Sequence, residues 1–284
     1  MRMRGVPVAQ EALVDIGVNL LDPAFDADRE AVIARAQEAG VIWQVLTGTQ
    51  LKCSEQSVAL AQQYPQQLRA TAGVHPHHAS TWQPDWQQTL AALLADPFCV
   101  AVGETGLDYN RLFSPESAQL LAFEAQLELA AEMQKPLFLH ERDAAQPMLE
   151  RLHHWRDDLA GGVLHCFTGD KKALFGYLDL DLYIGITGWI CDERRGQELA
   201  SLVRSIPADR LLIETDAPWL LPRTIKPKPK KGRNEPAFLP WVVEKLAAER
   251  GESPARVAAI TTANACRLFA LPLAESTDPS GEPL

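Results

Sequence analysis

The sequence lacks the features that mark membrane, secreted and disulfide-rich proteins. No apolar run among its 284 residues approaches the roughly 20 residues that a membrane-spanning helix needs. The first ten residues, MRMRGVPVAQ, are basic but have no apolar core of the kind found in a signal peptide. The five cysteines are scattered and form no CxxC pair, which favours reduced thiols over a disulfide framework. These absences predict a cytoplasmic protein that does not bind a membrane.

Two common catalytic motifs are also missing. There is no GxxxxGK loop followed by Ser or Thr, which excludes nucleotide hydrolysis of the P-loop type. There is no GxSxG sequence, which excludes the nucleophile elbow of a serine hydrolase. The net charge of −10 argues against a protein that nucleic acid wraps around over much of its surface. It is compatible with a local basic patch.

What the sequence does contain is an alternation of short apolar runs with helical patterns. The runs are typical of buried parallel strands and lie at 12–18, 41–47, 69–74, 98–104, 136–140, 162–165, 181–187 and 210–216. Helical patterns occur at 25–39, 54–63, 84–95, 116–134, 143–155, 170–178, 192–204, 236–249 and 254–269. Eight such units predict an α/β fold closed into a (β/α)8 TIM barrel, with its active site at the C-terminal ends of the strands. We expect one domain over residues 12–271, an extension at 1–11 and a disordered tail at 274–284.

Four candidate metal ligands lie at or near the ends of these runs. Glu104, His140, His165 and Asp216 end the runs at 98–104, 136–140, 162–165 and 210–216. A lone histidine at a strand end is more often structural, but two on neighbouring strands beside a glutamate favour a divalent-metal site. Glu214 competes with Asp216 for the inward direction, and Asp216 is preferred because it lies nearer the end of the strand.

Other residues near the strand ends have both a functional and a structural interpretation. His75 is the first of the three histidines in GVHPHH. One interpretation is that one of the three contacts substrate, and the other is that all three are solvated loop residues. Asp15 is either a ligand or a buried structural carboxylate. Arg142 grips an anion at the mouth of the site or pairs with a neighbouring acid. Strand alternation predicts that Cys166 points away from His165 and packs as a thiol.

The segment 222–236, PRTIKPKPKKGRNEP, is basic within an acidic chain. It carries six Lys or Arg and no acid before Glu235, and its prolines exclude a helix. A flexible solubilising loop is one interpretation. A loop that guides a polyanionic substrate past the metal site is the other, with Trp189 and Trp219 as stacking partners. The candidate substrate-binding residues in this segment are Lys226, Lys228, Lys230, Lys231 and Arg233.

Six motifs occur in order and together resemble the TatD family of metal-dependent deoxyribonucleases. They are GVHPHH, VGETGLDYNR, HERDA, LHCFTG, YIGITGW and LLIETDAPWLLP, and the resemblance runs from about residue 13 to residue 271. Within the family, DIGVN, TGWICDERRG and RNEP are similar to the Mg²⁺-dependent 3′–5′ exonucleases.

The resemblance implies an amidohydrolase-type TIM barrel that hydrolyses single-stranded DNA and RNA. It implies one or two divalent ions, Mg²⁺ with Mn²⁺ or Zn²⁺ as substitutes, and a cytoplasmic monomer with a part in repairing oxidative DNA damage. Carried over by motif, Glu104, His140 and His165 are metal ligands. Asp216 is the acidic residue of the eighth strand, expected to hold the ion or accept a proton, and His75 is the active-site histidine of the third.

One departure from the family pattern concerns the first strand. Most of the wider family carries D-x-H-x-H there, whereas this chain reads DIGVN, so that Gly17 and Asn19 stand at the histidine positions. This departure predicts a weakly held first ion, with Asp15 as its candidate ligand and water completing the site. Two alternatives stay open: a metal-dependent amide or ester hydrolase, for example one acting on aminoacyl-tRNA, and a binding module without catalysis.

Overall fold

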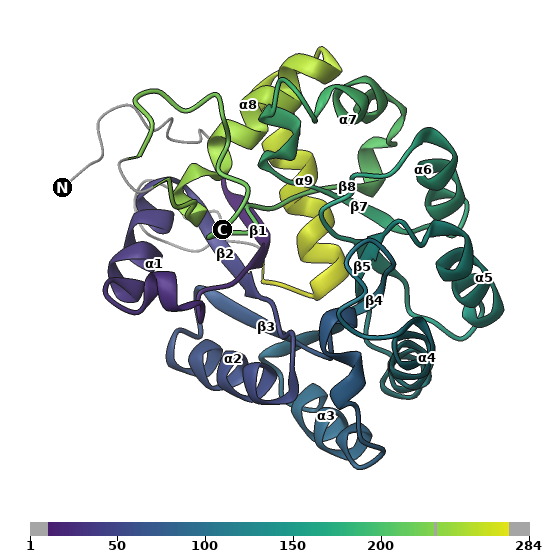
Figure 1. Ribbon diagram of the computed structural model, residues 1–284. Coiled ribbons are helices and arrows are strands. Elements are labelled where there is room, and N and C mark those ends of the chain that lie inside the picture. The colour runs from purple at the N-terminus through teal and green to yellow at the C-terminus, as the bar shows by residue number, and fades with distance from the viewer. Residues whose placement is uncertain (1–10, 230–231, 273–284) are drawn as a thin grey trace.

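Eight parallel strands form a barrel, and helices surround it (Figure 1). The computed structural model describes residues 11–229 and 232–272. Each strand hydrogen-bonds to the next in chain order, as the sequence predicts for a TIM barrel. The strands are β1 (Leu13–Val18), β2 (Val41–Leu46), β3 (Leu68–Ala72), β4 (Cys99–Asp108), β5 (Leu137–Arg142), β6 (Gly162–Leu164), β7 (Tyr183–Ile186) and β8 (Leu211–Ile213).

The helices follow the strands in the predicted order. They are α1 (Arg29–Glu38), α2 (Leu51–Gln63), α3 (Trp86–Leu94), α4 (Glu116–Met133), α5 (Ala145–Trp155), α6 (Lys171–Leu178), α7 (Gln197–Leu202), α8 (Leu239–Arg250) and α9 (Pro254–Phe269). The helix predicted at 192–204 begins late, because the Asp192 side chain accepts hydrogen bonds from the backbone N–H groups of Arg194 and Arg195 and holds a turn there. Within the described residues, no helix is both long and apolar enough to span a membrane.

The residues after β8 close the barrel against β1. Val18 forms a parallel bridge with Ala217, and the N–H of Asp216 donates to the carbonyl of Gly17 at 2.9 Å. The first strand and the segment after the last strand are therefore held together at the C-terminal end of the barrel.

The barrel interior is filled from its opposite end by α9. Inner residues such as Val14, Phe138 and Leu212 form one apolar cluster with Phe269 of α9. The Thr262 hydroxyl of α9 donates to the carbonyl of Ala12, just before β1. Because α9 covers the N-terminal ends of the strands, the C-terminal ends are left for the site.

Candidate metal centre and active site

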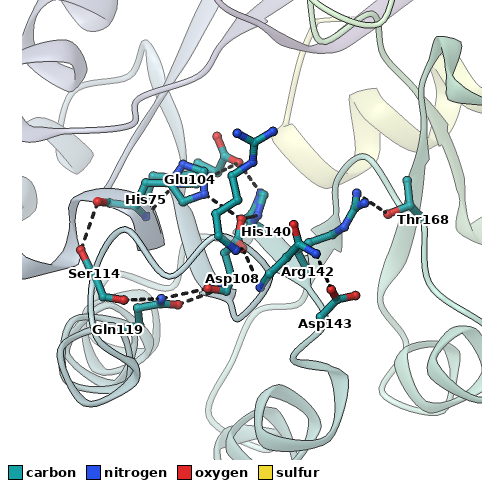
Figure 2. Close-up of polar contacts among 12 residues, drawn as sticks. His75, Glu104, Asp108, Ser114, Gln119, His140, Arg142, Asp143 and Thr168 are labelled. Atoms are coloured by element: carbon teal, nitrogen blue, oxygen red, sulfur yellow. Dashed lines mark hydrogen bonds and ion pairs between the residues drawn. The ribbon is translucent and has the colours of Figure 1, made fainter.

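One carboxylate oxygen lies at the centre of the site. Oε1 of Glu104 is 2.7 Å from Nε2 of His165, 3.0 Å from Nδ1 of His140 and 3.3 Å from Nε2 of His75. The three histidines come from the ends of β3, β5 and β6, and Figure 2 shows His75 and His140 converging on Glu104. The three predicted residues Glu104, His140 and His165 are thus brought together, and His75 joins them.

The position of Glu104 depends on an irregularity in β4. Val102 pairs with Leu137, but Thr105 pairs with Leu139, so β4 carries one extra residue at Gly103–Glu104. Such a bulge re-aims a side chain toward a site. Gly103 has φ of +145°, and a Cβ there would lie 2.2 Å from the carbonyl oxygen of Phe138, so only glycine fits.

Asp108 is a site residue that the sequence analysis missed, because it placed the end of the strand at Glu104. β4 continues to Asp108, whose Oδ2 lies 2.7 Å from Nε2 of His77 and 3.2 Å from Nε2 of His140. Burial raises the pKa of Asp108, but hydrogen bonds from His140 and His77 outweigh it and hold that pKa well below its usual value. The signal was available, since an even spacing from Glu104 puts Asp108 on the same face of the strand.

Glu214 orients His165 from the far side of the ring. Its Oε2 lies 3.3 Å from Nδ1 of His165, and its Oε1 accepts a hydrogen bond from the N–H of Cys166. A Cβ on residue 17 would lie 2.2 Å from Oε2 of Glu214, so Gly17 leaves the room that this carboxylate fills. Both Glu214 and Asp216 therefore point toward the site, rather than one in place of the other.

Asp216 lies in the same cavity as the histidines but is not part of the tightest cluster. It has φ of +52°, and its Oδ1 accepts a hydrogen bond from Nδ2 of Asn19 at 3.2 Å. Burial raises the pKa of Asp216 to about 8, and the negative charges of Glu214 and Glu104 add to this effect against that of His165. Its predicted roles as ligand and proton acceptor are considered below.

Asp15 has the contacts of a buried structural carboxylate, one of its two interpretations from the sequence, and its role as a metal ligand stays a prediction. It is fully buried, its Oδ1 accepts the N–H of Thr215 at 2.9 Å, and its Oδ2 accepts the Thr215 hydroxyl at 2.5 Å. Burial raises the pKa of Asp15 to about 7. Because both oxygens are occupied by internal donors, Asp15 ties β1 to the segment after β8 and is not among the residues that line the cavity.

The cavity over Glu104 has a volume of about 480 Å³, and arginines and aromatic rings line its rim. Arg111 follows β4, and Arg142 ends β5 with its guanidinium 3.4 Å from the Thr168 hydroxyl (Figure 2). Among the described residues, no carboxylate forms an ion pair with either arginine. Phe113 and Trp219 complete the rim.

The described part of the basic loop does not reach this cavity. Lys226 and Lys228 are exposed, and Lys228 lines a neighbouring pocket together with Arg223. Arg233 pairs with Asp28 at 2.7 Å and with Glu235 at 3.4 Å, so the structure gives it a role in holding the loop to the barrel. Lys230 and Lys231 lie outside the described residues. The substrate-binding role predicted for this loop stays a prediction.

Cys166 differs from its predicted direction. β6 ends at Leu164, and Cys166 has φ of +46°, so strand alternation no longer applies at this position. The thiol lies in the same cavity as His165, and burial raises its pKa well above the usual value. A half-buried thiol whose pKa is raised favours packing over metal binding.

The donor set fits a divalent ion. One ligand atom each from His75, Glu104 and His140 lie within 4.8 Å of one another. Imidazole nitrogens and carboxylate oxygens suit Zn²⁺ and Mn²⁺, and the carboxylates suit Mg²⁺. Two of the histidines also have an outer partner that orients the ring, Asp108 for His140 and Glu214 for His165, which is typical of metal sites.

Comparison with known proteins matches this arrangement to one family. The family model "TatD related DNase" matches residues 14–270. The chain belongs to the TatD DNase family. Two curated TatD relatives are each named "3'-5' ssDNA/RNA exonuclease TatD". The protein from Salmonella typhimurium is 52% identical over 90% of this chain and 98% of its own. The protein from Erwinia tasmaniensis is 53% identical over 91% of this chain and 100% of its own.

Solved structures of TatD proteins share the barrel. The TatD homologue YJJV from Escherichia coli is 27% identical, with a TM-score of 0.83 over 92% of this chain and 98% of that one. A TatD family hydrolase from Entamoeba histolytica has the same TM-score at 24% identity, over 91% of this chain and 98% of that one, and shows the fold alone. The predicted family and fold are confirmed.

Proposed function

We propose that this protein is a metal-dependent 3′–5′ exonuclease that hydrolyses phosphodiester bonds in single-stranded DNA and RNA. The observation that carries the proposal is the cluster in which three imidazoles surround Oε1 of Glu104 under an arginine-lined rim. Relatives more than 50% identical over almost their whole length bear the name of this activity. The part in repairing oxidative DNA damage that the resemblance implies stays a prediction.

We infer that Glu104, His140 and His165, with His75 and Asp216, hold one or two divalent ions. Mg²⁺ is the proposed ion, and the imidazole donors support Mn²⁺ or Zn²⁺ as substitutes. When bound, such an ion supplies positive charge that lowers the pKa of water and stabilises the extra charge on the reacting phosphate.

The remaining steps are assigned to residues of the chain. Arg142 and Arg111 bind the non-bridging oxygens of the phosphate, because their guanidinium groups line the cavity and no carboxylate in residues 11–229 or 232–272 pairs with them. Asp216 accepts the proton of the attacking water at a carboxylate oxygen, while Asn19 fixes its orientation. Asp108 and Glu214 keep the rings of His140 and His165 directed at Glu104.

The direct test incubates the purified protein with end-labelled single strands of DNA and RNA. We expect stepwise shortening from the 3′ end with Mg²⁺ or Mn²⁺ and none with EDTA. Strands blocked by a 3′-terminal phosphorothioate should resist, whereas strands with a labelled 5′ end should give a ladder. Unshortened strands under every metal condition, together with hydrolysis of amide or ester substrates, would support the amide or ester hydrolase alternative. We also propose that the protein acts as a monomer, which light scattering after size exclusion tests.

A further inference from the structure

Two exposed aromatic side chains face the same cavity. Phe113 is 65% exposed and Trp219 is 51% exposed, and both line the cavity that holds Glu104 and the histidines. Single exposed apolar side chains are common on proteins, but two that converge on one catalytic cavity indicate a binding surface.

The two rings come from opposite sides of the barrel. Phe113 lies in the loop after β4, and Trp219 lies in the segment after β8. Strands run in chain order around the barrel, so β4 and β8 are half a turn apart. The rings therefore reach the cavity from opposite sides, and Glu104 lines the same cavity. A cavity of about 480 Å³ is in the size range of small-molecule sites, so it takes only the end of a strand rather than a length of chain.

Both rings sit on segments that the structure fixes. The Asn234 side chain is fully buried and donates to the carbonyls of Trp219 at 2.7 Å and Thr215 at 2.9 Å. On the other side, the Phe113 ring packs edge-on against His77, with ring centroids 4.8 Å apart. Aromatic groups held in place before binding lose little entropy when a ligand stacks on them.

We propose that Phe113 and Trp219 stack on the two nucleobases that flank the scissile phosphate at the 3′ end of a single strand. This inference rests on the proposed function and names how the substrate is selected. Every base offers a flat face, so stacking accepts any sequence. Bases inside a duplex already stack on one another, so only an unpaired end can place one base on each ring. Arg111 and Arg142 lie at the same rim and receive the phosphate between the two bases.

The test combines ring removal with base removal. Phe113→Ala and Trp219→Ala are assayed on a single strand and on matched strands that lack the terminal or the penultimate base. Each variant should raise KM for the complete strand by about 5- to 100-fold, with kcat within about threefold, because stacking on the base stabilises ground and transition states alike. Each variant should lose this penalty on the strand that lacks the base its ring would bind.

Three controls separate stacking from disruption of the fold. Phe113→Tyr and Trp219→Phe keep a ring and should retain KM within about threefold. Phe175→Ala removes another exposed ring, on α6 and away from the cavity, and should match wild type. Thermal unfolding confirms that the alanine variants fold.

Binding separates this inference from the proposed function. Kd for a 5′-fluorescein strand is measured by anisotropy in EDTA, where no hydrolysis occurs, and both alanine variants should weaken it about 5-fold or more. A wild type that binds but never cleaves would overturn the exonuclease proposal alone. Penalties of equal size on complete and base-lacking strands, or equal binding by all variants, would overturn the stacking inference.

Discussion

At the residue scale, Glu104 determines the electrostatics of the site. Burial disfavours its charge, but the imidazoles of His75 and His165 and hydrogen bonds from His140 and His165 hold the pKa of Glu104 well below its usual value. The same ion pair has the opposite effect on the pKa of His165. Burial lowers the pKa of His165, but Glu104 and Glu214 outweigh it and raise that pKa well above its usual value. A centre of this kind keeps its carboxylate ionised inside the protein and ready for a cation.

The first prediction concerns these central residues. Glu104→Gln, His140→Ala and His165→Ala should each reduce hydrolysis of single strands by about a thousandfold or more, because each removes a group that orients or binds the ion. Initial rates and metal content are measured side by side. His153→Ala, an exposed histidine on α5, is the matched control and should keep full activity. Wild-type turnover and metal content in any of the three would remove that residue from the site.

The second prediction concerns Asp15, whose pKa burial raises from 3.8 to about 7. The folded state then holds a proton that the unfolded chain releases above about pH 4. The contribution to stability is complete below about pH 4 and is lost as pH rises through about 7. Asp15→Asn is neutral throughout and keeps the shape of the side chain. The free energy of unfolding of wild type relative to Asp15→Asn should fall by roughly 4 kcal/mol between pH 4 and 7.

Urea unfolding at a series of pH values measures this difference. Asp179→Asn changes an exposed carboxylate and should follow wild type at each pH. Parallel stability curves for wild type and Asp15→Asn would show that Asp15 stays ionised in the folded protein.

At the element scale, the segment after β8 has two parts with different tasks. Residues 214–219 close the barrel and carry Glu214, Asp216 and Trp219 to the site. In the part that follows, Lys228 lines a different pocket, and Arg233 bonds Asp28 through both terminal guanidinium nitrogens at 2.7 and 2.9 Å. Figure 1 shows this segment beside α1. Anchoring of the loop and delivery of site residues are therefore separable by mutation.

The third prediction tests the anchor. Arg233→Ala should lower the melting temperature by a few degrees and leave KM for oligonucleotides within about twofold, because its partners are Asp28 and Glu235. A hydrogen bond from Arg233 holds the pKa of Asp28 at about 2, against a usual 3.8. The stabilisation of the folded state by the Arg233–Asp28 pair is therefore present above about pH 4 and is lost as pH falls toward 2. Scanning calorimetry across this range should show wild type and Arg233→Ala converging at the acid end. A large rise in KM would restore Arg233 as a substrate-binding residue.

The fourth prediction tests the lysines of the loop. Changing Lys226, Lys228, Lys230 and Lys231 to Gln should raise KM for oligonucleotides more than it lowers kcat, because phosphate binding by the loop stabilises ground and transition states alike. The salt dependence should flatten by roughly 0.7 in log–log slope for each phosphate that the loop no longer neutralises.

A paired variant controls for the change in net charge. We compare a variant with Lys226 and Lys228 changed to Gln with one in which Lys171 and Lys172 are changed to Gln. The second pair is exposed on α6. A small chromogenic phosphodiester, too short to reach the loop, should be hydrolysed equally by all. An unchanged KM in the variant with all four substitutions would support the other interpretation of the segment, a solvated loop that does not bind substrate.

At the scale of the whole molecule, the barrel keeps stability and chemistry at opposite ends. The N-terminal end is packed by α9, while the C-terminal end holds the charged groups. This division allows buried charge at the site, because the strands that carry it are fixed by an apolar interior elsewhere. An ion bound at the site also links function to global stability, since it binds the folded chain and not the unfolded one.

The fifth prediction follows from the first strand. Gly17 and Asn19 provide no imidazole, and Glu214 fills the space beside Gly17. Calorimetric titration of the metal-free protein should therefore show one tight ion, with a second only at high concentration or with substrate phosphate present. Saturation at about 100 times Kd should raise the unfolding free energy by about 2.7 kcal/mol. Glu104→Gln should lose the tight site. Two equally tight sites in the free protein would contradict the prediction.

The sequence by itself determined the barrel and the centre of the site. Apolar runs alternating with helical patterns are local signals, and eight of them in order specify the topology. The side chains that end parallel strands must meet at one end of a barrel, so Glu104, His140 and His165 could be placed together without coordinates. Family motifs then added His75 and supported Asp216.

Only the tertiary structure decided what depends on pairing between distant residues. The bulge in β4 sets the direction of Glu104, and the pairing of β4 with β5 continues beyond the bulge to Asp108. A local sequence pattern does not reveal this pairing or the bulge. Asp15 accepts a hydrogen bond from Thr215, which is 200 residues away in the sequence. Arg233 donates one to Asp28, which is 205 residues away. A charged side chain in a sequence has many candidate partners, and the fold selects among them by bringing only some within hydrogen-bonding distance.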